Sequence, residues 1–191
     1  MKKIVIFASG SGSNAENIIS YFSENNDISF PCILSNKADA YVRVRAEKLG
    51  VHFRSFSKDE LQNGAVLELL QEINPDLIIL AGFLPRVPEH IVNSYPHKII
   101  NIHPSLLPKH GGKGMYGMHV HEAVVSAGDS ESGISIHYVN ENLDEGAIIF
   151  QAKCEVTSTD TAEDVAKKVH ELEYEYFPKI IEKLISETQA K

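Results

Sequence analysis

The sequence of 191 residues predicts an α/β fold of the Rossmann-like type, with a mostly parallel sheet and helices on both faces. Through the first hundred residues, apolar runs of strand length alternate with helical segments, which is the pattern of βα units. The pattern then changes, because two strand-like runs, 134–139 and 147–156, are separated by only a short loop. This spacing predicts a C-terminal antiparallel hairpin, and apolar residues at helical spacing predict a long helix after it.

The first half of the chain alternates strands and helices regularly. We expect strands at residues 4–8, 30–34, 51–56 and 77–81, and helices at residues 15–22, 40–49 and 60–73. The second helix ends at Gly50, and glycine is a favoured residue just past a helix end. The run 77–81 is apolar throughout, as expected for a strand that helices cover on both faces.

The second half is expected to start with a short helix at 91–94 and a strand at 98–103. After the hairpin, the run Asp160 to Glu163 fits a capping box at the start of the last helix. Pro178 should kink or restart that helix, because proline lacks the backbone N–H. Size and composition predict one domain over residues 1–191.

Composition limits the classes of function. The net charge of −8 argues against general nucleic-acid binding, although backbone N–H groups can still hold a local anion. Cys32 and Cys154 form no C-x-x-C pair and are expected to be buried thiols in a reducing compartment. The N-terminal apolar run is too short for a signal peptide, and the longest run, 77–84, is too short for a membrane span. We expect a cytoplasmic protein without membrane contact; the oligomeric state stays open.

The most informative segment is Asn101 to Pro108. Side chains alternate faces along a strand, so Asn101 and His103 should point to one side while Ile100 and Ile102 pack on the other. Pro104 should end the strand. An amide and an imidazole would then stand at the carboxyl edge of the sheet, where open α/β sheets bind ligands.

The loop Ser9 to Asn14 lies between the first strand and the first helix. Its glycines and the following helix N-terminus are suited to an anion, and we interpret it as a monophosphate site. The spacing Gly10-x-Gly12 also fits a dinucleotide fingerprint, but the second strand ends without the acid that would hold a ribose. A plain turn before a helix is the remaining alternative.

Asp144 lies in the hairpin loop, where an Asp before Gly is common turn chemistry. If the loop folds over the sheet edge, Asp144 would raise the pKa of His103 and favour imidazolium. Five histidines fall between residues 97 and 121, but their spacing does not favour a metal site. We expect His137 to be a satisfied sheet histidine and the glycine-rich loop at 110–114 to be mobile.

These segments together resemble the folate-dependent formyltransferases, and within them the family that acts on glycinamide ribonucleotide. The resemblance rests on Ser9 to Asn14, residues 35–38, residues 80–84, Asn101 to Pro108, and residues 143–146. It implies transfer of a formyl group from the co-substrate 10-formyltetrahydrofolate to the amine of glycinamide ribonucleotide, in purine (IMP) biosynthesis. The substrates are small molecules, and no metal is implied.

The resemblance also implies roles for individual residues. The catalytic residues would be Asn101, His103 and Asp144, and the phosphoribosyl-glycinamide site would contain Gly12, Ser13, Asn14 and Glu173. The folate site would contain Lys58, Leu84, Pro85, Arg86, Val87, Asn101, Asn140 and Leu143. In the mechanism that we expect, Asn101 and imidazolium His103 stabilise the oxyanion, and Asp144 keeps His103 charged and helps to move a proton.

The chain departs from the family pattern at three places. Pro85 and Arg86 stand where an Arg is usual, Lys58 replaces an Arg, and residues 109–118 form a longer segment than in many members. Two relatives, a formyltetrahydrofolate hydrolase and a methionyl-tRNA formyltransferase, carry a further domain, so the length of this chain favours the small-substrate transferase. Two other classes stay open: an NAD(P)-binding oxidoreductase that uses the Gly10/Gly12 loop, and a non-catalytic phosphoribosyl-binding protein.

Overall fold

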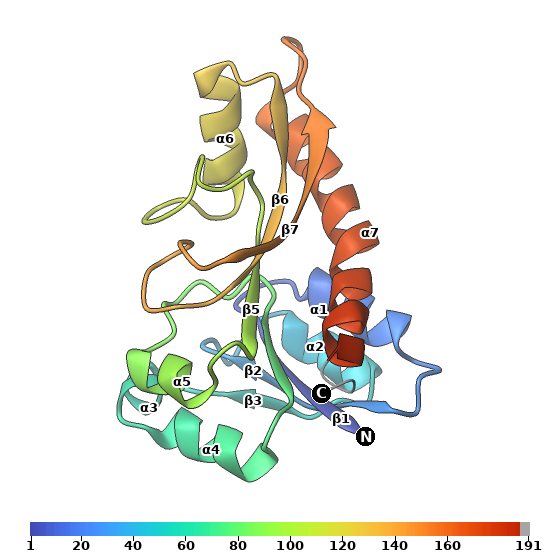
Figure 1. Cartoon of the computed structure of the whole chain (residues 1–191), viewed down its shortest axis with the longest axis vertical. Helices are drawn as coiled ribbons and strands as arrows, with labels where there is room; N and C mark the ends of the chain where they lie inside the picture. The colour runs from blue at the N-terminus through green and yellow to red at the C-terminus, as the bar shows by residue number, and fades with distance from the viewer. Residues whose placement is uncertain (188–191) are drawn as a thin grey trace.

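A computed structural model describes residues 1–187, which form one seven-stranded sheet with helices on both faces (Figure 1). The strands are β1 (Lys2–Phe7), β2 (Ile28–Ser35), β3 (Phe53–Ser55), β4 (Leu77–Leu80), β5 (Ile99–His103), β6 (Glu131–Tyr138) and β7 (Ile148–Glu155). The helices are α1 (Ser13–Tyr21), α2 (Val42–Lys48), α3 (Lys58–Gln62), α4 (Ala65–Ile73), α5 (Glu89–Ser94), α6 (Met118–Ala127) and α7 (Ala162–Glu187).

The strand order is β3-β2-β1-β4-β5-β6-β7, and the first five strands are parallel. β6 pairs antiparallel with β5, and β7 pairs antiparallel with β6. The predicted Rossmann-like sheet and C-terminal hairpin are therefore confirmed. The order reverses between β1 and β4, so the loops after these strands diverge and leave room for a ligand at their carboxyl ends.

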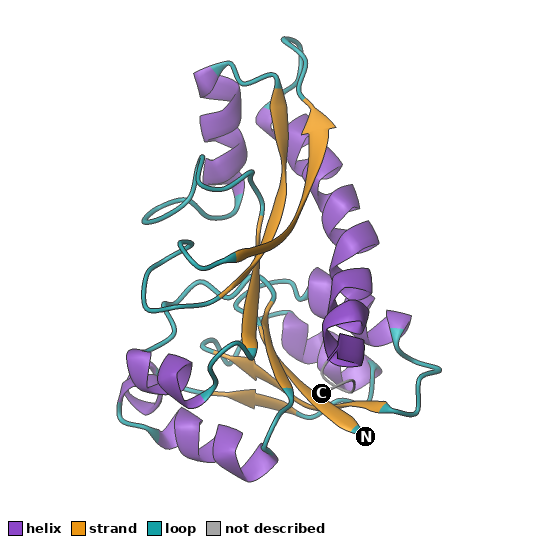
Figure 2. Ribbon diagram, viewed as in Figure 1, coloured by secondary structure: helices purple, strands orange, loops and turns teal. Residues whose placement is uncertain are grey.

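Two apolar clusters hold the helices against the sheet. One joins alternate residues of β1, such as Ile4 and Ile6, to α1, α2 and α7, and buries Phe177 completely. The other joins the opposite residues of β1, such as Val5 and Phe7, to α3, α4 and α5. Figure 2 shows these helices on the two sides of the sheet, with α7 lying along most of the length of the molecule. Burial on both faces explains why β4 and residues 4–7 of β1 are apolar throughout.

The helices differ from the sequence prediction at three places. The expected helix at 60–73 is two helices, because Gly64 between α3 and α4 takes φ +100°, which is outside the helical region. α6 was not predicted, because among its ten residues only Val120, His121 and Val124 are buried. α7 continues through Pro178 without restarting, since the flanking residues Phe177 and Ile181 are buried in the core.

The start of α7 also differs by one residue from the prediction. The reciprocal capping bonds join Thr161 and Asp164, with 2.9 Å from Thr161 N to Asp164 Oδ2 and 3.2 Å from Asp164 N to Thr161 Oγ1. Asp160 instead accepts a hydrogen bond from Lys168 at 2.6 Å. Within residues 1–187, no helix combines the length and apolar character that crossing a membrane requires.

Candidate active site

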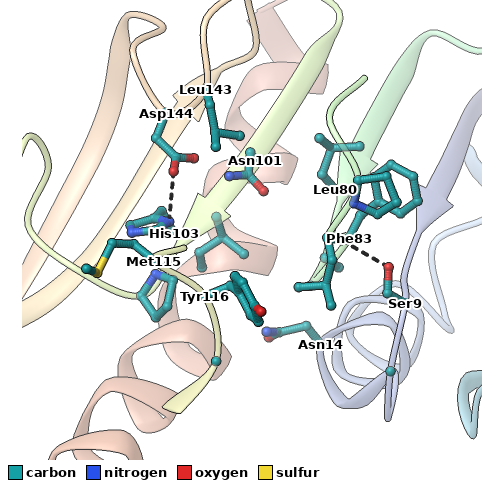
Figure 3. A pocket seen from close by; sticks show the side chains of 18 of the residues that line it. Ser9, Asn14, Leu80, Phe83, Asn101, His103, Met115, Tyr116, Leu143 and Asp144 are labelled. Carbon is teal, nitrogen blue, oxygen red and sulfur yellow. Dashed lines mark hydrogen bonds and ion pairs between the residues drawn. The ribbon is translucent and has the colours of Figure 1, made fainter. Parts of the chain in front are cut away.

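The carboxyl ends of β1, β4 and β5 meet at one edge of the sheet, beside a cavity of about 620 Å³. This volume is in the range of small-molecule binding sites. Most of the lining comes from four regions that are far apart in the sequence: the loop 9–14, the segment 80–87, the end of β5 with the loop after it, and the hairpin loop 139–144. His121 of α6, His137 of β6 and two residues of α7, His170 and Glu173, are also part of the lining. The sheet thus brings the predicted motifs together (Figure 3).

β5 places Asn101 and His103 at the cavity, as predicted, while Ile100 and Ile102 are buried together in the apolar cluster that contains α1 and α7. In the antiparallel pairing with β6, Asn101 lies opposite His137 and His103 lies opposite Ser135. Directly paired residues project from the same face of a sheet, so β6 adds the His137 side chain to the site.

The hairpin loop brings Asp144 over the end of β5. Asp144 has φ +58°, a conformation that Asp tolerates better than most residues. Gly146 packs so closely on β6 that a Cβ there would stand 1.7 Å from the Tyr138 carbonyl oxygen, which requires glycine. The Asp144 carboxylate lies 3.6 Å from His103 Nδ1 and 3.7 Å from His137 Nε2. It also accepts a hydrogen bond from the Gly112 N–H at 3.0 Å.

His137 belongs to this site, and the sequence interpretation missed its place there. Its Nδ1 donates to the Tyr138 carbonyl at 2.9 Å, and its Nε2 accepts from Asn101 Nδ2 at 3.1 Å. These partners fix the tautomer, because the carbonyl can only accept and the amide nitrogen can only donate. His137 therefore fixes the orientation of the Asn101 amide. The alternation of residues 134–137 signalled its face, but the register that pairs it with Asn101 was not readable from the sequence.

The predicted resting charge of His103 is wrong. Burial lowers the pKa of His103, and the neighbouring Asp144 carboxylate and the His110 carbonyl raise it by less, so the net pKa lies below its ordinary value. Burial also raises the pKa of Asp144, but the adjacent His137 and His103 rings and the hydrogen bond from the Gly112 N–H together bring it below its ordinary value. At neutral pH the pair is thus a neutral imidazole beside an ionised carboxylate.

The two ring nitrogens of His103 have different partners. Nε2 donates to the His110 carbonyl at 2.8 Å, since a carbonyl can only accept. Neutral His103 therefore carries its proton on Nε2 and presents the lone pair of Nδ1 toward Asp144 and the cavity. A proton taken up at Nδ1 would lie between His103 and a carboxylate, which favours the charged form.

The loop 9–14 begins α1, and Gly12 immediately precedes that helix with φ +73°. A Cβ at Gly12 would stand 2.2 Å from Val42 Cγ2, so the tight turn against α2 requires glycine. Asn14 Nδ2 donates to Glu173 of α7 at 2.9 Å, and Asn14 Oδ1 is buried without a partner. The N–H groups of the first turn of α1 have no intrahelical acceptor, and this arrangement suits an anion.

The segment 83–87 forms another wall of the cavity. Leu84 N donates to Ser9 Oγ at 3.0 Å, and Arg86 donates to the Glu141 carbonyl, so this wall is tied to both the loop after β1 and the hairpin loop. The side chains of Leu84 and Leu143 are 49% and 44% exposed at the cavity. Apolar surface of this kind suits a flat heteroaromatic ring.

All but one of the predicted site residues line the cavity: Gly12, Ser13, Asn14, Leu84, Pro85, Arg86, Val87, Asn101, His103, Asn140, Leu143, Asp144 and Glu173. Lys58, the first residue of α3, does not line it, and its folate contact stays a prediction. The cavity also includes residues that the sequence interpretation did not assign, among them Lys113, Tyr116, His121 and His170. Tyr116 faces the centre of the site near Asn14 (Figure 3).

Metal ligands are not grouped in the described part of the chain: no three His, Cys, Asp or Glu side chains there are arranged to hold a metal ion.

The fold and the site define a class, a Rossmann-like transferase with acid–base groups beside an anion loop. The chain belongs to the formyl transferase family, whose model matches residues 2–181.

Relatives support this assignment over nearly the whole chain. A phosphoribosylglycinamide formyltransferase of Haemophilus influenzae is 37% identical, over 95% of this chain and 86% of its own. The enzyme of that name from Bacillus subtilis is 36% identical, over 97% and 95%. The crystal structure of a phosphoribosylglycinamide formyltransferase from Bacillus halodurans superposes with a TM-score of 0.87 at 32% identity, covering 98% of this chain and 97% of that one.

Proposed function

We propose that this chain is a phosphoribosylglycinamide formyltransferase, which transfers the formyl group of 10-formyltetrahydrofolate to the amine of glycinamide ribonucleotide. The products are formylglycinamide ribonucleotide and tetrahydrofolate, in de novo purine synthesis. One observation carries the proposal: Asn101, His103 and Asp144 stand in one cavity between an anion loop and an apolar wall. The family membership and the names of the relatives agree with it.

The loop 12–14 binds the phosphate of glycinamide ribonucleotide through backbone N–H groups and the Ser13 hydroxyl. Asn14 Oδ1, which has no protein partner, is free to accept a hydrogen bond from the substrate. Glu173, held by Asn14 and by His170 Nδ1 at 2.9 Å, faces the same end of the cavity and accepts hydrogen bonds from the ribose hydroxyls. The amine of the substrate then extends toward Asn101 and His103.

The folate lies against residues 84–87 and under the hairpin loop at 140–143. The exposed Leu84 and Leu143 side chains fit the apolar faces of a pterin. The co-substrate supplies a formyl group bound to nitrogen, and the site must activate that group toward the amine. Asn140 and the backbone of this loop supply hydrogen bonds at the rim.

The reaction joins the amine nitrogen to the formyl carbon and breaks the bond from that carbon to the folate nitrogen. The Asn101 amide donates a hydrogen bond to the formyl oxygen as negative charge develops there. His103 Nδ1 accepts the proton that the amine loses, and the imidazolium so formed is stabilised by Asp144 and by the His110 carbonyl. The same proton passes to the departing folate nitrogen, so His103 ends as it began.

The family membership rejects the NAD(P)-dependent oxidoreductase interpretation of the Gly10/Gly12 loop. A cytoplasmic location and the absence of nucleic-acid and membrane partners stay predictions from composition. We also propose that residues 1–191 act as one domain.

An ultraviolet assay tests the proposed function directly. The purified chain should cause loss of a 10-formylfolate analogue only when glycinamide ribonucleotide is present. Loss of the formyl group in the absence of any amine substrate would instead indicate a hydrolase. No loss under either condition, with both ligands shown to bind by calorimetry, would indicate a non-catalytic binding protein.

A further inference from the structure

His103 depends on a backbone carbonyl that lies outside the substrate cavity. The carbonyl oxygen belongs to His110, and it accepts the His103 Nε2 proton at 2.8 Å. The neighbouring carbonyl of Lys109 accepts from Ser105 Oγ at 2.6 Å. His103, the last residue of β5, and Ser105, just after the strand, are thus held by two consecutive carbonyls of the segment 109–110. The position of this short segment sets the position and the tautomer of the His103 ring.

The segment 109–110 is itself held by one side chain, that of Asp129. Asp129 Oδ2 accepts from His110 Nε2 at 2.7 Å, and Asp129 Oδ1 accepts from Lys109 Nζ at 2.9 Å. His110 has φ +52°, which a residue other than glycine adopts only where its surroundings hold it. The side chains of His110 and Asp129 are both 17% exposed, whereas that of Lys109 is 69% exposed. We call the contacts of Asp129 with His110 and Lys109 the clamp, and the less exposed His110–Asp129 contact is its stronger half.

Asp129 is itself well placed to act as an anchor. It follows the end of α6, where Gly128 takes φ +67°, and its backbone N–H donates to the Val124 carbonyl at 3.3 Å. The hydrogen bonds from His110 and Lys109 hold the pKa of Asp129 below its ordinary value, so the carboxylate is ionised at neutral pH. Neither His110 nor Asp129 lines the substrate cavity.

We propose that Asp129 and His110 are positioning residues for formyl transfer, because Asp129 holds the His110 ring and thereby the His110 carbonyl that fixes His103. The inference rests on the proposed function, in which His103 Nδ1 must present a lone pair to the amine proton. The carbonyl selects the neutral tautomer with the proton on Nε2 and then stabilises the imidazolium as it forms. Because the clamp lies behind His103, its loss affects turnover and leaves substrate binding unchanged.

The test compares Asp129→Ala, His110→Ala and the double variant with wild type. Each single variant should lower kcat by about ten- to hundredfold, as small misplacements of catalytic groups do, with both KM values within about twofold. The double variant should be no slower than the slower single variant, because both changes break one connection. Glu131→Ala is the matched control: its carboxylate is on the same edge of the protein but pairs with exposed Lys153, and kcat should be unchanged.

A second measurement does not depend on activity. The ¹⁵N shifts of the His103 ring, measured on the ligand-free protein above its titration, should show the Nε2–H tautomer in wild type. They should show a mixture of tautomers in Asp129→Ala and His110→Ala. If Asp129→Ala does not fold, His110→Ala decides the matter, since it leaves the end of α6 intact.

Wild-type kcat together with a wild-type tautomer in the folded variants would overturn the inference. A rise in KM without any change of tautomer would overturn it as well, because that result would give the clamp a role in substrate binding alone. If the wild-type protein transferred no formyl group, the proposed function would fail, while the ring shifts would still decide whether the clamp sets the His103 tautomer.

Discussion

At the residue scale, the site combines a buried neutral imidazole with an ionised carboxylate. The side chains of His103 and Asp144 are only 6% and 7% exposed, so few water molecules can screen their interaction. Burial decides the resting state of His103, and Asp144 decides how readily it takes up a proton. A neutral imidazole can accept the proton of the amine, and its lowered pKa helps it to return that proton to the departing nitrogen. An imidazole that was charged from the start could not accept the proton.

Asp144→Asn should move the His103 titration to lower pH, because it removes the neighbouring anion that favours imidazolium. Turnover should fall by about a hundredfold, within the range usual for acid–base groups. Histidine NMR titration of the wild type and the variant measures the shift. A His103 pKa that is unchanged or raised would show that Asp144 does not influence the imidazole.

Asn101→Ala should lower kcat by about 10²- to 10³-fold, the usual effect of removing one donor to an oxyanion. Binding of both substrates should change little, because the bond to the formyl oxygen strengthens only as charge develops. Steady-state kinetics and calorimetric titration separate the two effects. Asn93→Ala, on an exposed position of α5, is the control and should leave both unchanged. Near-wild-type kcat in folded Asn101→Ala would contradict its role.

The sequence predicted the positions of Asn101 and His103 correctly because strand alternation is a local rule. It did not predict the place of His137, which depends on the pairing register of β5 with β6. It also gave the wrong resting charge for His103, because burial is a property of the whole fold whereas a charged neighbour can be inferred from a loop. Local rules thus predicted which residues form the site, and tertiary packing determined their protonation.

At the element scale, the phosphate loop shows how a backbone position limits the sequence. Gly12 needs a left-handed conformation and has no room for a Cβ beside Val42. Gly10, two residues earlier, has an ordinary φ and open space around it. Both glycines line the cavity, but only one is required by the geometry of the turn.

Gly12→Ala should destabilise the protein by about 1–3 kcal/mol, the usual cost of overpacking. It should also weaken the binding of glycinamide ribonucleotide more than the binding of folate. The reason is that the turn must open and carry the first N–H groups of α1 away from the phosphate. Gly10→Ala is the matched control and should change the free energy of unfolding by less than about 0.5 kcal/mol. Chemical denaturation and calorimetric titration measure the two effects, and equal behaviour of the two variants would contradict the argument.

Helix prediction succeeded where the end signals were strong and failed where they were weak. Gly50 marked the end of α2 correctly, since Leu49 caps a helix that ends at Lys48. α6 has no side-chain cap at its start, and its two buried valines are poor helix formers. Only Gly128, at its end in the left-handed conformation, was an available signal for this helix.

At the scale of the whole molecule, the sheet places the chemistry where the strand order reverses. Loops that are distant in sequence supply the phosphate site, the folate wall and the acid, and no single element carries the function. The alternation of strands and helices, visible in the sequence, predicted this arrangement. The hairpin and α7 complete the site by adding Asp144, His137 and Glu173.

The buried histidines make stability depend on pH. Burial lowers the pKa values of both His103 and His121 in the folded state. Between those lowered values and the ordinary histidine pKa, the unfolded chain binds more protons, so stability increases with pH and is lost as the pH falls from about 6.5. The free energy of unfolding should therefore decrease from pH 7.5 to 5.5, and His103→Gln should show a smaller decrease. An equal decrease in this variant would contradict the assignment for His103.

The central claim is that His103 performs the proton transfer of formyl transfer without holding either substrate in place. The most direct test is kcat of His103→Ala in the formylfolate assay, measured together with the affinities for both substrates. We predict a loss of kcat of about 10²- to 10⁴-fold, the range of general acid–base catalysis, with both dissociation constants within about threefold of wild type. A folded His103→Ala variant with kcat within threefold of wild type would contradict the account.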